Sequence, residues 1–107
     1  MANILALTSN QRRDIISAIH NPRFLVSASL INNMHKYTIC DKKGRVIYSI
    51  DVYKDDRHVV TYCGNVIADS NTFGNNIVEL RYIKYIISVL MERYNREASM
   101  DAYVKKR

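Results

Sequence analysis

The residues best suited to chemistry lie in one short stretch, Asp55-Asp56-Arg57-His58. A histidine can act as a general base, and an arginine beside it can bind a phosphate, which together outline a metal-free ribonuclease. The same four residues are also ordinary in a solvent-exposed hairpin turn, and their spacing identifies no reaction. We therefore place an endoribonuclease-like enzyme third among the candidate functions and expect a protein that is not an enzyme.

Other catalytic and cofactor-binding motifs are missing from the sequence. There is no nucleophile elbow around a serine and no glycine-rich phosphate loop, and the chain has three glycines in all. A C-x-x-C pair, which would suggest zinc, is also absent. We expect neither a cofactor nor a metal ion.

The two cysteines, Cys40 and Cys63, fall on strands that flank a central one. Two strand spacings of about 4.8 Å would separate them by roughly 9–10 Å. A disulfide needs Cα atoms closer than about 7 Å. We expect both thiols to be unpaired, reduced and buried, as free cysteines commonly are.

The chain contains eight tyrosines. Aromatic rings on a sheet face flanked by basic groups can stack on single-stranded nucleic acid and hold its phosphates. The expected strand registers bring such residues together, and they form the candidate nucleic-acid surface: Tyr37, Tyr53, Tyr62, Lys42, Lys43, Arg45 and His58. Two alternatives are that the N-terminal helix covers this face, or that the tyrosines form a protein interface, where tyrosine is enriched.

A long helix is expected from Asn76 to about Asn95, and the other elements must pack around it. Asn76 and Glu79 have the spacing of a capping box. Apolar residues follow at intervals of three and four, which is the period of one helix face: Ile77, Leu80, Ile83, Ile87, Leu90 and Tyr94.

The same helix carries a second apolar stripe, formed by Tyr82, Ile86 and Val89. A helix on one sheet face normally needs a single stripe. The second stripe predicts either a helix sunk between the sheet and the N-terminal helix, or contact with a partner, of which a second copy of this chain is one candidate.

Residues 36–69 have the alternating pattern of an antiparallel meander. Asp41-Lys42-Lys43-Gly44 predicts a turn with Gly44 in the left-handed position and Cys40 opposite Val46. The next turn is expected to set Tyr53 opposite His58. These registers assign the core face of the sheet, which the long helix should cover: Thr38, Cys40, Val46, Tyr48, Ile50, Val52, Val59, Thr61 and Cys63.

Before the meander, Thr8 to His20 predicts a short helix, with Thr8 and Gln11 as a capping box and Asn21-Pro22 as its stop. Residues 23–31 alternate as a strand, which we favour, although Asn21-Pro22 would equally begin a second helix. Beyond Asn95 the helical pattern weakens, leaving residues 100–107 as a frayed turn or a short separate helix. The expected fold class is α+β: a short N-terminal helix, an antiparallel meander of three to five strands and a long C-terminal helix on one sheet face.

Size and charge give the remaining expectations. A chain of 107 residues, 48% of them hydrophobic, predicts one compact domain over residues 1–107. No apolar run approaches the roughly 18 residues of a membrane span, and the start lacks the order of a signal peptide, so we expect a cytoplasmic protein without a membrane partner. A net charge of +6 favours anionic partners.

The composition is rich in Ile, Asn, Lys and Tyr and poor in Gly, Pro and Trp. AT-rich genomes encode such proteins, and many small phage and mobile-element proteins have this composition. We expect a small basic binding protein of that type, an inhibitor or regulator of a host protein or nucleoprotein complex in an anti-defence, anti-CRISPR-like or transcription-modulating role. Binding of single-stranded nucleic acid is the alternative.

Overall fold

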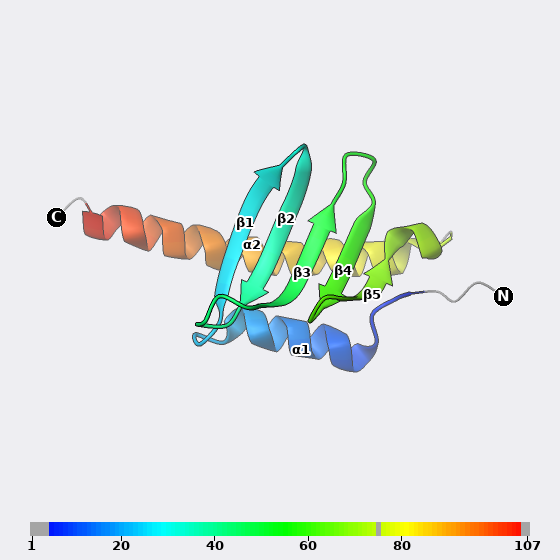
Figure 1. The fold of residues 1–107 in the computed structure, drawn as a ribbon, viewed down its shortest axis with the longest axis horizontal. Helices are drawn as coiled ribbons and strands as arrows, with labels where there is room; N and C mark the ends of the chain where they lie inside the picture. Colours follow the sequence, from blue (N-terminus) through cyan, green and yellow to red (C-terminus); the bar gives the residue numbers. More distant parts are fainter. Residues whose placement is uncertain (1–4, 75, 106–107) are drawn as a thin grey trace.

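The computed structural model describes residues 5–74 and 76–105 of the chain. Two helices, a five-stranded antiparallel sheet and one short 3-10 helix follow one another along the sequence (Figure 1). The elements are α1 (Ser9–His20), β1 (Leu25–Ile31), β2 (Met34–Cys40), β3 (Val46–Val52), β4 (His58–Tyr62), β5 (Asn65–Asp69), η1 (Ser70–Thr72) and α2 (Ile77–Lys105). The α+β fold expected from the sequence is confirmed, and residues 25–31 form a strand.

Helix α1 begins where its capping box predicts. The hydroxyl of Thr8 accepts a hydrogen bond from the Gln11 backbone amide, and the Gln11 side chain accepts one from the Thr8 amide. These two bonds satisfy amides that the first helical turn leaves free. Its apolar face, Ile15, Ala18 and Ile19, is buried.

Each strand pairs with its neighbour in sequence, giving the order β1-β2-β3-β4-β5. Two of the hairpins close with two-residue loops, Asn32-Asn33 and Cys63-Gly64, in which every residue has a positive φ. That conformation matches the twist of the flanking strands, and asparagine and glycine adopt it at low cost.

Both helices lie on one face of the sheet, with α2 crossing the strands and α1 packed beside it (Figure 1). The core lies between the helices and this covered face. Its most deeply buried side chains are Ile15, Ile19, Ile39, Ile50, Val60, Ile83, Ile86 and Leu90. The opposite, open face is polar in its middle, where Ser27 bonds Thr38 and Ser49 bonds Thr61.

The predicted assignment of sheet faces is correct for Tyr48, Ile50 and Val52 on β3 and wrong for the neighbouring strands. Ile39 on β2 and Val60 on β4 point into the core, whereas Thr38, Val59 and Thr61 lie on the open face. The first cause is a bulge: Cys40 pairs with Val46 as predicted, but Ile39 pairs with Tyr48, leaving Ile47 unpaired. A one-residue shift moves a strand's side chains to the other face.

The second cause is the β3–β4 turn. Val52, and not Tyr53, pairs with His58, because this turn repeats the geometry of the β2–β3 turn. The amide of Tyr53 bonds the carbonyl of Arg57 at 2.9 Å, as Asp41 bonds Arg45, and Asp56 takes the left-handed position of Gly44. Aspartate tolerates that conformation better than most residues.

Helix α2 is longer than the sequence predicted. It runs without interruption to Lys105, and its C-terminal part extends past β1, beyond the edge of the sheet (Figure 1). Within the described part of the chain, no helix has the length and hydropathy that a membrane span requires.

Candidate functional site

The candidate functional site is a basic corner of the molecule at the β2–β3 turn. Asp41 shapes this turn, because its carboxylate accepts hydrogen bonds from the backbone amides of Lys43 and Arg45, both at 2.9 Å, and from Arg45 Nε at 2.8 Å. These bonds, with the Arg45 amide as the largest cause, lower the pKa of Asp41. The turn therefore holds the Lys42, Lys43 and Arg45 side chains outward on a fixed backbone.

The start of β1 completes the basic corner. Antiparallel pairing sets Leu25 opposite Cys40, which brings Arg23 and Phe24 beside the turn. Together with Asp41, Lys42, Lys43 and Arg45 they line a surface hollow of about 410 Å³. Four of the six side chains are cationic, and Asp41 already binds Arg45, so the corner carries a net positive charge. Such a surface attracts phosphates and carboxylates.

A buried arginine on α2 fixes the backbone behind the basic corner. Arg93, 6% exposed, donates from Nη1 to the carbonyl oxygens of Ile19 at 2.8 Å and Asn21 at 3.0 Å, and from Nη2 to that of Phe24. Its Nε donates to Glu97 at 2.7 Å. The connection from α1 to β1 is thereby held against α2, and Arg23 lies within it.

The residues of the candidate nucleic-acid surface do not form one platform. Tyr37 is half-buried on the covered face of the sheet. Tyr53 lies in the β3–β4 turn, and the Tyr62 ring packs against Tyr48 with centroids 4.8 Å apart. Lys42, Lys43 and Arg45 are together in the basic corner, so the structure assembles the predicted phosphate contacts without the predicted stacking rings.

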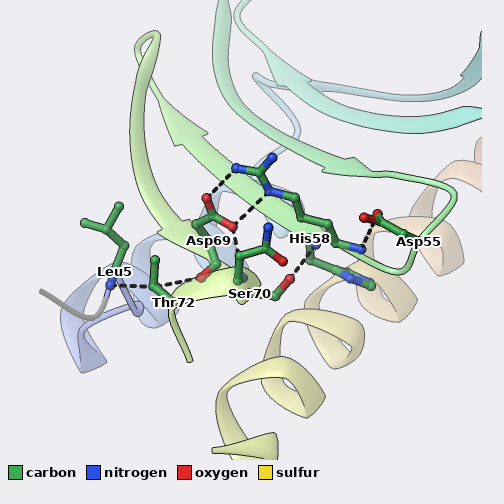
Figure 2. A network of polar contacts seen from close by, with 8 residues as sticks. Leu5, Asp55, His58, Asp69, Ser70 and Thr72 are labelled. Carbon is green, nitrogen blue, oxygen red and sulfur yellow. Dashed lines mark hydrogen bonds and ion pairs between the residues drawn. The ribbon is translucent and has the colours of Figure 1, made fainter. Parts of the chain in front are cut away.

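His58, predicted both as a nucleic-acid contact and as a general base, is a core residue. It is 2% exposed on the covered face, so the prediction that it contacts nucleic acid is wrong. Its Nδ1 lies 2.8 Å from the carbonyl oxygen of Asp56 and must donate there, because a carbonyl only accepts. Its backbone amide donates to the Ser70 hydroxyl at 2.8 Å (Figure 2).

Arg57, the predicted phosphate-binding partner of His58, pairs with Asp69 on β5. Nε and Nη2 of Arg57 lie 3.2 and 2.7 Å from the two carboxylate oxygens of Asp69, which form a bidentate pair with it. Figure 2 labels Asp69 within the network of polar contacts. The bond from Arg57 is the largest cause that lowers the pKa of Asp69. Thr72 bonds both the Asp69 carbonyl and the Leu5 amide, so the network ties β4, β5 and η1 to the N-terminal segment.

The second stripe of α2 belongs largely to the core. Ile86 is 0% exposed, which contradicts its prediction as a partner contact. Tyr82 and Val89 are half-buried, and Arg12 of α1 lies over the Tyr82 ring while also pairing with Glu79. The stripe thus fits the alternative in which α2 is sunk between the sheet and α1.

The two cysteines are free thiols, as predicted. Cys40 is half-buried, but Cys63 is exposed, so the prediction that it is buried is wrong. The reason is that Cys63 lies in the β4–β5 loop at φ 49° and not within a strand.

Comparison with known proteins gives no relative: no family model, curated protein or solved structure matches this chain. In the described residues, histidine, cysteine and acidic side chains do not gather into a group of three that could hold a metal ion.

Proposed function

We propose that this protein is a small basic binding protein without catalytic activity, which attaches to an acidic surface of a protein or nucleoprotein partner and thereby inhibits or regulates it. The observation that carries the proposal is the basic corner, where Arg23, Lys42, Lys43 and Arg45 surround one hollow. Three of these side chains extend from a turn fixed by Asp41, so they lose less freedom on binding than cations on a mobile tail would.

The proposal favours carboxylates of a folded partner over a single nucleic-acid strand. Stacking on aromatic rings supplies much of the affinity for single strands, about 1–3 kcal/mol per base. Tyr37 and Tyr62 lie on the covered face, where Tyr62 packs against Tyr48, and Tyr53 lies in a turn. The three rings therefore form no open platform on which bases could stack. Direct nucleic-acid binding through phosphates alone stays the alternative.

Fluorescence anisotropy with two labelled probes tests this choice: an acidic polyglutamate peptide and a single-stranded oligonucleotide of equal charge, near physiological salt. The proposal expects tighter binding to the peptide. Replacing both turn lysines, Lys42→Glu with Lys43→Glu, should weaken that binding tenfold or more. Tighter binding to the oligonucleotide, weakened by the same two lysine replacements, would instead establish the alternative.

A matched control separates the corner from the overall charge. Lys54→Glu with Arg81→Glu makes the same change in net charge at exposed positions outside the corner. If both double variants lose the same affinity, the corner is not a site and the positive charge acts only at long range. Circular dichroism of each variant checks that the fold is retained.

A further inference from the structure

Strand β1 presents an open sheet edge. Its sequence, Leu-Val-Ser-Ala-Ser-Leu-Ile, contains no charged residue and no proline, and its pairing with β2 runs without a bulge. Charges, prolines, bulges and covering segments are the usual means by which proteins prevent an edge strand from pairing with another chain. Edge strand β1 has no charge, no proline and no bulge.

The other edge, β5, is protected. Its pairing with β4 contains a register shift, and the N-terminal segment lies against its end, where the Asp69 amide donates to the Leu5 carbonyl at 2.9 Å. Strand β5 is also shorter, with five residues against seven in β1. Of the two edges, β1 is therefore the one suited to accept a further strand.

The sequence of β1 is symmetric about Ala28. Reading outward from Ala28, the paired positions are Ser27 with Ser29, Val26 with Leu30, and Leu25 with Ile31. Two antiparallel copies centred on Ala28 would set serine opposite serine and an aliphatic side chain opposite an aliphatic side chain at every step. Matched cross-strand pairs of this kind stabilise antiparallel sheets.

Apolar side chains left exposed on β1 fit the same arrangement. Leu25, Leu30 and Ile31 are 52%, 62% and 47% exposed. Val26, on the same face as Leu30, is buried beneath the helical layer. Pairing centred on Ala28 would place Leu30 of one copy beside Val26 of the other, and therefore beside the helix that covers it.

Helix α2 provides that cover. Its 29 residues give a length of about 44 Å, whereas five strands span only about 19 Å. The excess extends past β1 (Figure 1). Met100, 61% exposed on this extension, continues the spacing of the buried Ile86, Leu90 and Arg93. The described part of the chain supplies no covering element there.

We propose that two copies of this chain form a symmetric dimer in which their β1 strands pair antiparallel about Ala28. The two sheets then join into one, and the α2 extension of each copy lies over the β1 end of the other. This interface adjoins the basic corner at the start of β1 but does not depend on the proposed function. It differs from a contact through Tyr82, Ile86 and Val89, because it uses the free sheet edge.

Sedimentation velocity of the full chain over a concentration series tests the dimer. Wild type should sediment as a dimer, and Leu30→Lys should raise the dimer dissociation constant at least tenfold, because it sets a cation among apolar groups. The matched control is Val66→Lys on β5, whose side chain is 46% exposed, and it should leave the dimer intact. A monomeric wild type, or equal effects of the two lysines, would overturn the proposal.

Cysteine crosslinking tests the register and does not depend on a destabilising change. In a background of Cys40→Ser and Cys63→Asn, Ala28→Cys places two thiols directly opposite each other, within the roughly 4.4–6.8 Å that a disulfide spans between Cα atoms. Mild oxidation should give a covalent dimer. Ser29→Cys, whose two copies lie farther apart, should crosslink much less. Equal crosslinking at both positions, or none at Ala28→Cys, would contradict pairing centred on Ala28.

Discussion

The guanidinium of Arg93, in the middle of α2, donates a 2.8 Å hydrogen bond to the carbonyl oxygen of Ile19 in the last turn of α1. Asn21 and Phe24 supply two further carbonyl acceptors to the same side chain. The Ile19 carbonyl is one of the groups that the end of a helix leaves unpaired, and the other two lie in the connection that follows α1. One arginine therefore caps the end of α1 and fixes the approach to β1.

Arg93→Lys should lower the free energy of unfolding by on the order of 3 kcal/mol, because a lysine cannot reach all the carbonyls and buried acceptors left without a donor are costly. Urea unfolding followed by circular dichroism measures this. Arg96→Lys, at an exposed position one turn later, is the control and should change little. Similar stability of the two variants would mean that Arg93 is not an anchor.

Ile86→Glu should unfold the protein. Ile86 is 0% exposed, and a carboxylate there would be buried without a partner. The expected result is loss of the cooperative thermal transition, whereas Val78→Glu, 62% exposed on the same helix, should keep it. A folded Ile86→Glu variant whose mass in solution differs from that of wild type would instead indicate that Ile86 lies in an interface.

Asp69 should give the protein part of its acid sensitivity. Its pKa is lowered in the folded state, so its stabilising effect is present above the ordinary aspartate pKa of about 3.9 and is lost as the pH falls through the folded value. Asp69→Asn should lower the free energy of unfolding by about 1–2 kcal/mol near neutral pH, a value reduced because Arg57 is partly exposed to solvent. The variant should also show a flatter decline of unfolding free energy below about pH 4. Asp14→Asn, on the exposed side of α1, is the control in the same urea titrations.

The two thiols should differ in reactivity. In native protein, a thiol reagent such as Ellman's should modify the exposed Cys63 quickly and the half-buried Cys40 more slowly. Cys63→Asn should remove the fast phase and keep the fold, because asparagine tolerates the φ of 49° at this position. Equal slow rates for both thiols would contradict the placement of Cys63 in the exposed loop.

Local signals in the sequence predict much of this fold. The Thr8–Gln11 capping box, the Asp41–Gly44 turn and the apolar period of α2 each depend on neighbouring residues, and each is found in the structure. The faces of β2 and β4 could not be obtained in this way. A bulge at Ile47 and an aspartate in the left-handed position of the next turn each shift a register by one residue.

The sequence predicts half of the basic corner. Lys42, Lys43 and Arg45 are neighbours in sequence, but Arg23 joins them only through the pairing of β1 with β2. The signal that could have found it is Asn32-Asn33, a pair suited to a tight hairpin loop. Folding 23–31 back on 34–40 about that loop brings Arg23 to the Asp41 turn. No comparable local signal identifies the three carbonyl partners of Arg93.

The sequential strand order has a consequence for the route by which the chain folds. Every strand joins its sequence neighbour through a short loop, so the sheet can grow one hairpin at a time with little loss of chain entropy. The bond from Arg93 to Ile19 instead spans 74 positions and must wait until α2 reaches α1. We therefore expect the α1–α2 junction to form after the transition state, so that loss of Arg93 hastens unfolding and leaves the rate of refolding nearly unchanged.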